Sequence, residues 1–187
     1  MEWTADNMRD KQILVVGLRG TGKTVWTKWF IRKFTRPVVF DPLDEYKDFT
    51  RYVPTAREPG EEMQAEFDQF FRSIKGKKVS CLAIDEANRI MPNREKPSVS
   101  CRDIIDLGRH DKRCYVFIAR RPTQITTDAV ELTDRVVFFR LDGKNDIKYI
   151  NDIKEGMGDA VRELKPYHYI IYDRSNGEYA VHAPVKP

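Results

Sequence analysis

The eight residues from 17 to 24 constrain this chain more than any other stretch of its sequence. They read Gly-Leu-Arg-Gly-Thr-Gly-Lys-Thr, which fits the pattern G-x-x-x-x-G-K-[ST] at every fixed position. Glycines let successive backbone N–H groups turn toward one anion, and a following helix directs the positive end of its dipole at the same point. The apolar run Gln12–Val16 precedes the motif and a helical segment follows it. The motif therefore predicts a strand, a phosphate-binding loop (residues 17–24) and a helix.

Each side chain of the phosphate-binding loop has an expected partner on a bound nucleotide. Lys23 is expected to reach the β- and γ-phosphates, and Thr24 to supply a hydroxyl oxygen to Mg²⁺. An ordinary glycine turn before a helix is the alternative, and the complete match in this context disfavours it. The residues expected to bind ATP are Gly17, Arg19, Gly20, Thr21, Gly22, Lys23, Thr24 and Val25.

An acidic pair follows a second apolar run, residues 79–84. A site that hydrolyses ATP needs a carboxylate opposite Thr24, which we expect at the end of a neighbouring strand. We expect Asp85 to hold Mg²⁺ through a water molecule, and Glu86 to orient or deprotonate the attacking water. Such a pair alone is more typical of a helix N-terminus, but beside the phosphate-binding loop it predicts an ATPase.

The hydrophobic pattern predicts an α/β fold in which strands alternate with helices. Runs buried on both faces favour a mainly parallel central sheet with flanking helices on both sides. Ser175-Asn176-Gly177 between two β-rich runs predicts a C-terminal antiparallel hairpin over residues 167–183. Residues 44–51 are polar and are expected to form a loop. The other expected strands are Gln12–Val16, Pro37–Phe40, 79–84, 115–119 and 136–139, and the expected helices are 23–34, 60–76, Val99–Leu107 and 145–164, the last broken at Gly156.

Length and composition limit the class of protein. A chain of 187 residues, 41% hydrophobic and 33% charged, is expected to form a single globular domain over residues 1–187. Its three cysteines are odd in number and widely spaced, which is typical of reduced thiols. No secretory signal and no apolar run long enough for a membrane helix is found, so we expect a soluble protein. The net charge of +4 is compatible with nucleic acid without requiring it.

Several segments resemble motifs of one superfamily. Asp41-Pro42 with Glu45 follows the second expected strand, and Asp85-Glu86-Ala87 with Arg89 follows the third. Gly108-Arg109-His110 precedes the fourth and Arg121-Pro122 follows it, while residues 164–173 contain the first strand of the expected C-terminal hairpin. Together they resemble the HerA–FtsK superfamily of ring-forming DNA pumps. The resemblance is greatest to genome-packaging ATPases of icosahedral viruses with internal membranes, such as archaeal turreted viruses and tectivirus-like viruses.

The resemblance implies two further site residues. Arg109 is the first candidate for an arginine finger that acts on the nucleotide of the next subunit, with Arg113 as the second candidate. The family usually has a glutamine before the Arg-Pro step as a γ-phosphate sensor, and this chain has Arg120 there. Either Arg120 takes the sensor role as a cation, or Gln124 or Thr123 replaces it.

The resemblance also implies a function, a motor that uses ATP to pump double-stranded viral DNA into a preformed capsid. The expected partners are double-stranded DNA, further copies of the chain in a hexameric or pentameric ring, and capsid vertex proteins. The expected location is the host cytoplasm or the packaging vertex of the virion. Two alternatives remain: a phage assembly or secretion ATPase of the same superfamily, and a nucleotide switch or kinase that is not a motor. A GTPase is disfavoured because no Asn-Lys-x-Asp motif is present.

A polar loop follows the acidic pair at residues 93–98. It carries Arg94 and Lys96, and a mobile basic loop in a ring of subunits can grip DNA phosphates. An ordinary solvated loop is an equal alternative.

Overall fold

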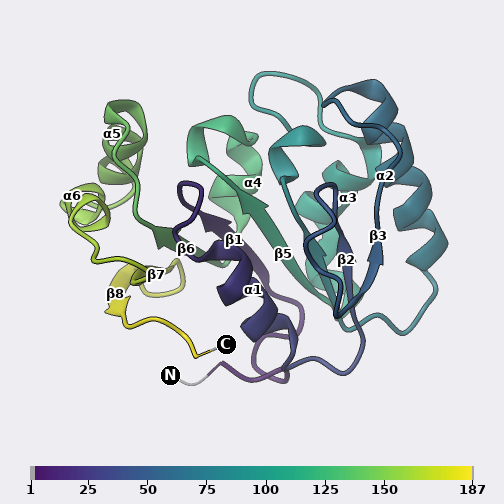
Figure 1. The fold of residues 1–187 in the computed structure, drawn as a ribbon, viewed down its shortest axis with the longest axis horizontal. Helices are drawn as coiled ribbons and strands as arrows, with labels where there is room; N and C mark the ends of the chain where they lie inside the picture. Colours follow the sequence, from purple (N-terminus) through teal and green to yellow (C-terminus); the bar gives the residue numbers. More distant parts are fainter. Residues whose placement is uncertain (1–2, 187) are drawn as a thin grey trace.

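The computed structural model describes residues 3–186, which form one eight-stranded sheet in the order β3-β2-β4-β5-β1-β6-β7-β8 (Figure 1). Neighbouring strands from β3 to β6 in this order are parallel, and β7 and β8 are antiparallel to their neighbours. The strands are β1 (Gln12–Val16), β2 (Pro37–Phe40), β3 (Thr50–Tyr52), β4 (Cys81–Ile84), β5 (Cys114–Ala119), β6 (Arg135–Phe139), β7 (Tyr169–Asp173) and β8 (Glu178–His182).

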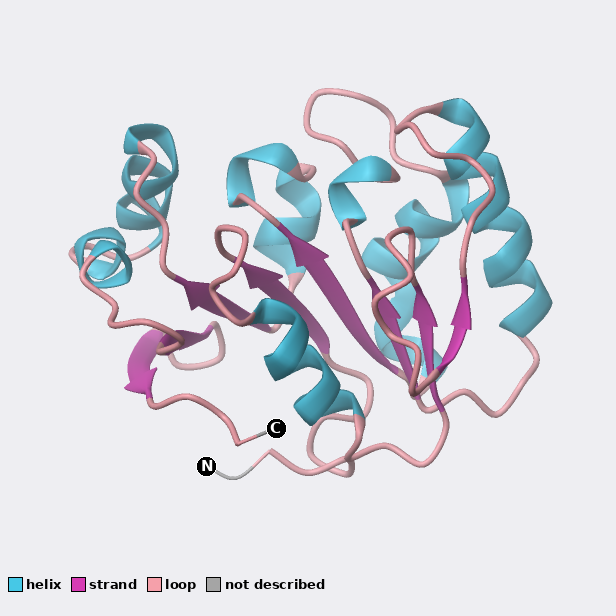
Figure 2. Ribbon diagram, in the orientation of Figure 1, coloured by secondary structure: helices cyan, strands magenta, loops and turns pink. Residues whose placement is uncertain are grey.

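Helices cover both faces of the sheet, unequally (Figure 2). Helix α1 follows the phosphate-binding loop and packs on one face, and helices α2 to α6 pack on the other. The helices are α1 (Lys23–Ile31), α2 (Glu61–Ile74), α3 (Val99–Leu107), α4 (Thr127–Leu132), α5 (Lys144–Ile153) and α6 (Met157–Arg162). Short 3-10 turns lie at Ala87–Arg89, Gly108–Asp111 and Pro122–Gln124.

Strand β1 shows how the sequence produces two cores. Alternate residues of a strand point to opposite faces. Leu14 and Val16 belong to the core under α2 to α6, whereas Ile13 and Val15 belong to the core under α1. All four are fully buried, and each contributes about 1.5–3 kcal/mol relative to exposure. This burial holds the end of β1, and the loop that follows it, in a fixed position.

The predicted fold class is confirmed, including the mainly parallel sheet and the C-terminal antiparallel hairpin. The expected break in the last helix is also found, because Gly156 adopts φ 76° between α5 and α6. The prediction of a loop over 44–51 is wrong at its end, where β3 begins at Thr50. This edge strand is short and polar, so its sequence has no hydrophobic pattern from which a strand could be predicted. Within residues 3–186 it pairs with β2 alone. Helix α4 was not predicted, and α1 ends at Ile31.

The strand order corrects one further expectation. Strand β4, which precedes Asp85, is not the neighbour of β1, because β5 pairs with both of them. The order of strands depends on long-range pairing that no local pattern encodes. As a consequence, the carboxyl end of β5 lies between the phosphate-binding loop and the acidic pair.

No helix within residues 3–186 combines the length and the apolar character that crossing a membrane requires.

Candidate active site

The phosphate-binding loop connects β1 to α1 at the carboxyl edge of the parallel strands (Figure 1). Gly17 is required by close packing, since a Cβ atom there would come within 2.5 Å of the Phe139 Cβ on β6. Gly22 adopts φ 109° as the N-cap of α1, a conformation that side chains rarely take. The first N–H groups of α1 have no partner inside the helix and are available to an anion at this edge.

The Lys23 ammonium lies inside the loop. Its Nζ atom donates hydrogen bonds to the carbonyl oxygens of Gly17 at 2.7 Å and Leu18 at 2.9 Å. Burial lowers the pKa of Lys23, and the nearby carboxylates of Asp85 and Glu86 oppose that effect. The ammonium group therefore lies within electrostatic reach of the acidic pair, as phosphate binding between the two requires.

A carboxylate from the loop after β2 meets Thr24. The Thr24 hydroxyl donates to Glu45 Oε2 at 3.2 Å. The backbone of this loop is held by the fully buried Asp41, whose carboxylate accepts from the N–H groups of Glu45 at 3.0 Å and Tyr46 at 2.8 Å. Sequence reasoning quoted Glu45 only as part of a resemblance and gave it no role in the site. The sequence signal for Glu45 was its position just after an expected strand. That this strand, β2, pairs with β4 is visible only in the structure.

Asp85 is 5% exposed at the end of β4. Burial raises the pKa of its carboxyl group to about 7, and the charges of Glu86, Glu45 and Asp41 act in the same direction. Three carboxyl groups thus act on Asp85, and one of them, Glu45, also accepts from the Thr24 hydroxyl. This oxygen-rich and negative environment suits a hard divalent cation such as Mg²⁺. No three of the His, Cys, Asp and Glu side chains in residues 3–186 form a metal-binding set by themselves. A cation here would therefore need oxygens from the phosphates or from water as well.

Glu86 is paired with the candidate sensor. Its backbone adopts φ 46°, a left-handed conformation uncommon for a side chain of this size. Its Oε1 atom lies 3.0 Å from Arg120 Nε, at the end of β5, and the two side chains are 12% and 50% exposed. The ion pair places a cation directly against the carboxylate expected to activate water.

The side chain of one alternative sensor is engaged elsewhere. The Thr123 hydroxyl donates to Asp146 Oδ1 of α5 at 2.7 Å. Gln124 follows on the same 3-10 turn, and its backbone carbonyl accepts from the Asn93 N–H at 3.1 Å. Of the three candidates, Arg120 is the one whose side chain contacts the acidic pair.

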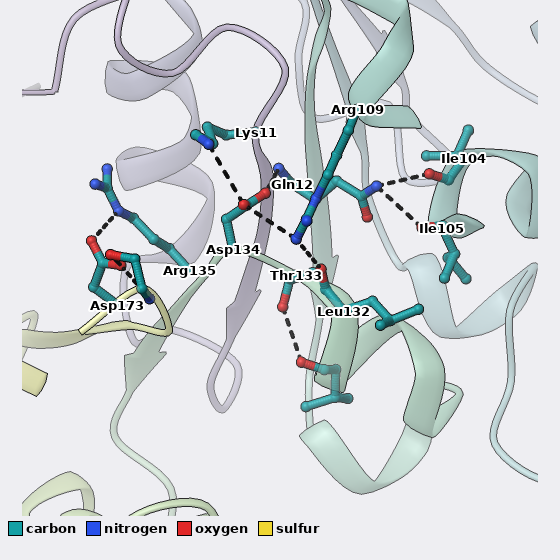
Figure 3. Close-up of polar contacts among 12 residues, drawn as sticks. Lys11, Gln12, Ile104, Ile105, Arg109, Leu132, Thr133, Asp134, Arg135 and Asp173 are labelled. Atoms are coloured by element: carbon teal, nitrogen blue, oxygen red, sulfur yellow. Dashed lines mark hydrogen bonds and ion pairs between the residues drawn. The ribbon is translucent and has the colours of Figure 1, made fainter. Parts of the chain in front are cut away.

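Arg109 lies at the opposite edge of the sheet, on the 3-10 turn before β5 (Figure 3). Strand β5, which lies between Arg109 and Arg120 in the chain, has six residues and spans about 20 Å at about 3.3 Å per residue. The Arg109 Nη2 atom lies 3.4 Å from Asp134 Oδ1 and its side chain is 60% exposed. The second candidate, Arg113, is buried and donates to the carbonyl oxygens of Val79 and Ile74. The structure thus brings Lys23, Thr24, Asp85, Glu86 and Arg120 together and leaves Arg109 outside.

The remaining predicted contacts lie on the surface of the loop. Arg19, Gly20 and Val25 are exposed, and Thr21 donates from its hydroxyl to the Leu18 carbonyl at 2.7 Å.

The fold and the site define an ATPase with a phosphate-binding loop. The family model for ATPases associated with various cellular activities (AAA) matches residues 13–141, and the chain belongs to this family. It binds ATP and hydrolyses it. A comparison with curated protein sequences finds no match.

The chain is similar in structure to B204, the genome-packaging NTPase of Sulfolobus turreted icosahedral virus 2, in its complex with ATP-gammaS. The TM-score is 0.82 at 17% identity, over 95% of this chain and 98% of that one. It is also similar to B204, the DNA-packaging ATPase of Sulfolobus turreted icosahedral virus, with a TM-score of 0.80 at 19% identity over 96% and 100% of the two chains. The N-terminal domain of zonular occludens toxin from Neisseria meningitidis gives a TM-score of 0.59 at 14% identity over 95% and 96% of the two chains. The expected resemblance to viral packaging ATPases is confirmed at the level of the fold.

Proposed function

We propose that this ATPase is a motor that moves double-stranded viral DNA into a preformed capsid. The observation that carries the proposal is the match to packaging NTPases along almost the whole length of both chains. A fold hosts many functions, so the proposal needs support from the site and from the surface as well.

In the hydrolysis step, Lys23 and the N–H groups of the loop hold the β- and γ-phosphates. Thr24 and Asp85 hold Mg²⁺, a role that fits the cluster of carboxyl groups raising the pKa of Asp85. When bound there, Mg²⁺ would supply positive charge to offset the charge that develops on the transferred phosphoryl group. Glu86 orients the attacking water, and Arg120, which contacts Glu86, serves as the γ-phosphate sensor.

Arg109 acts in trans on the nucleotide of a neighbouring subunit. It is exposed and lies beyond the amino end of β5, which spans about 20 Å, so it has to serve a different site. An exposed ion pair such as the one with Asp134 is worth at most about 1 kcal/mol, so the guanidinium is easily released. This requirement predicts a closed head-to-tail ring, a hexamer or pentamer. Mixing Arg109→Ala with Lys23→Ala subunits should restore activity at shared sites, and no recovery would exclude the finger.

A basic groove at the amino edge of the sheet provides a surface for the DNA backbone. Six exposed cations, the buried Arg113 and two acids line a hollow of about 760 Å³, so the lining carries a balance of +5. None of the six forms an ion pair with any residue in the described range, 3–186. The exposed cations of this basic groove are Arg9, Arg36, Lys75, Lys77, Lys78 and Lys112.

The experiment is the ATPase rate with and without double-stranded DNA, with the particle sized in the same samples. A ring-sized species stimulated by DNA supports the motor, and a monomer indifferent to DNA refutes it. Replacing Lys75, Lys77 and Lys78 by Ala should lower the slope of log affinity against log salt by about 3, one for each lost phosphate contact. Replacing Arg94 and Lys96 by Ala is the parallel variant, because their loop is the other exposed basic segment considered for DNA contact. The variant with the larger loss of salt dependence identifies the surface that binds DNA.

A phage assembly or secretion ATPase is the second candidate, supported by the similarity to zonular occludens toxin. It predicts ATP hydrolysis that double-stranded DNA does not stimulate. The proposed motor works as a single domain, at a capsid vertex or in the host cytoplasm, with capsid proteins as partners.

A further inference from the structure

A small apolar hollow lies beside the phosphate-binding loop, on the side of the C-terminal hairpin. It has a volume of about 170 Å³. The residues that line it include Gly22, Val25, Phe139, Tyr167, Tyr169 and Pro184, and we call it the apolar slot. The triphosphate chemistry of the site makes no use of it.

Tyr167 is held at this slot in an unusual way. Its backbone adopts φ 63°, a left-handed conformation that is strained for an aromatic residue. Its side chain is nevertheless 59% exposed, so burial of the ring does not explain the strain. A Cβ atom at Gly22 would come within 3.4 Å of Tyr167 Cδ1, so the ring lies directly against the phosphate-binding loop.

Val25 lines the same slot. It follows Thr24 in the first turn of α1 and is 45% exposed. The first N–H groups of α1 are available to the phosphates, so the rest of a bound nucleotide lies within reach of this turn. Two exposed apolar side chains, Val25 and Tyr167, thus line a slot that the base can reach.

We propose that the apolar slot holds the base of the bound nucleotide, with Tyr167 as the stacking contact. The volume supports one ring system rather than a whole nucleotide, because sites for complete drug-sized ligands take about 300–1,000 Å³. The phosphates therefore stay on the loop while the base enters the slot.

The lining of the slot also predicts weak selectivity among bases. It contains no charged or amide side chain, and its side-chain polar groups are the hydroxyls of two tyrosines and the indole N–H of Trp26. A site that hydrogen-bonds its ligand rejects analogues by about 10⁴–10⁵-fold, whereas an apolar pocket discriminates by about 10–200-fold at most. The slot therefore admits adenine and guanine with affinities within about 200-fold of each other. This inference concerns nucleotide binding and is independent of DNA translocation.

The test compares Tyr167→Ala, Tyr167→Phe and a control, Val181→Ala, which changes an equally exposed apolar residue of the same hairpin outside the slot. Binding of ATP, GTP and inorganic tripolyphosphate is measured for each by calorimetry. Tyr167→Ala should weaken ATP and GTP equally, by about tenfold, and leave tripolyphosphate unchanged. Tyr167→Phe and Val181→Ala should bind all three like the wild type.

Equal weakening of tripolyphosphate would show that Tyr167 only shapes the loop and would overturn the proposal. So would unchanged ATP affinity in Tyr167→Ala, or a wild-type preference for ATP over GTP above about 200-fold. If Tyr167→Ala unfolds, Tyr167→Trp provides the readout. Its fluorescence should respond to ATP and not to tripolyphosphate, and the reverse result refutes the slot.

Discussion

Asp85→Asn should make the protein more stable at pH 8, in the absence of nucleotide, while removing the carboxylate proposed to hold Mg²⁺. Burial and three neighbouring carboxyl groups raise the pKa of Asp85 from 3.8 to about 7. The folded state thus binds this proton more tightly than the unfolded chain does. The ionised carboxylate costs stability, because asparagine has no charge to desolvate and still offers an oxygen to the Glu86 N–H.

The size of the effect follows from the same pKa values. Each tenfold change in proton affinity corresponds to about 1.4 kcal/mol, so a pKa raised from 3.8 to about 7 costs about 4 kcal/mol as an upper limit. Relaxation around the charge reduces this, and we expect a gain of about 2 kcal/mol at pH 8. This loss of stability is absent below pH 3.8, the pKa of Asp85 in the unfolded chain. It grows as the pH rises and is complete above about pH 7, the pKa in the folded protein. At pH 5 less than half of it remains.

Urea unfolding at pH 5 and pH 8, without nucleotide or divalent cations, measures the difference. Asp146→Asn is the matched control, since Asp146 is also buried but accepts from Thr123 and pairs with Arg121. We expect that change to lower stability at both pH values. An Asp85→Asn protein less stable than the wild type at pH 8, or equally stabilised at both pH values, would refute the reasoning.

Three other changes test the site. Glu86→Gln should slow hydrolysis by at least about 10²-fold with ATP affinity preserved, measured by single-turnover kinetics beside equilibrium binding, and undiminished turnover would remove its role. Arg120→Ala, which frees Glu86 Oε1, should lower kcat more than it changes KM. Arg120→Gln introduces the residue usual in the superfamily and should retain activity. Equal rates in the two variants would exclude a sensor role for this position. Asp41→Ala leaves the N–H groups of Glu45 and Tyr46 without their acceptor and should cost about 2–4 kcal/mol in urea unfolding, while Asp41→Asn, which keeps an acceptor, should cost less.

The sequence predicts well what short segments determine. The phosphate-binding loop, Asp85 and Glu86 each follow a buried strand directly, so their positions depend on neighbours along the chain and their meeting at one edge follows from a parallel sheet. Glu45 and the ion pair of Arg120 with Glu86 depend instead on which strands lie side by side. That arrangement comes from long-range packing, and the same limit explains why β5 was not expected between β1 and β4.

Tyr167 shows a different limit. A tyrosine before a β-rich run reads as a packing residue, because its left-handed backbone and its contact with Gly22 depend on how the hairpin returns to α1. Edge strand β3 escaped prediction for a related reason, since three polar residues gain their strand conformation only from pairing with β2.

Strand β5 lies between the guanidinium groups of Arg109 and Arg120, which in a closed ring would belong to different catalytic centres. Its six residues are all buried, and the strand pairs with β1 on one side and β4 on the other, which makes it one of the stiffest parts of the molecule. In the proposed ring, Arg120 at one end would sense the subunit's own phosphates, while Arg109 beyond the other end would reach those of the next subunit. Sequential ATP hydrolysis around such a ring would then need no large hinge motion, because a small displacement of strand β5 would move both guanidinium groups together.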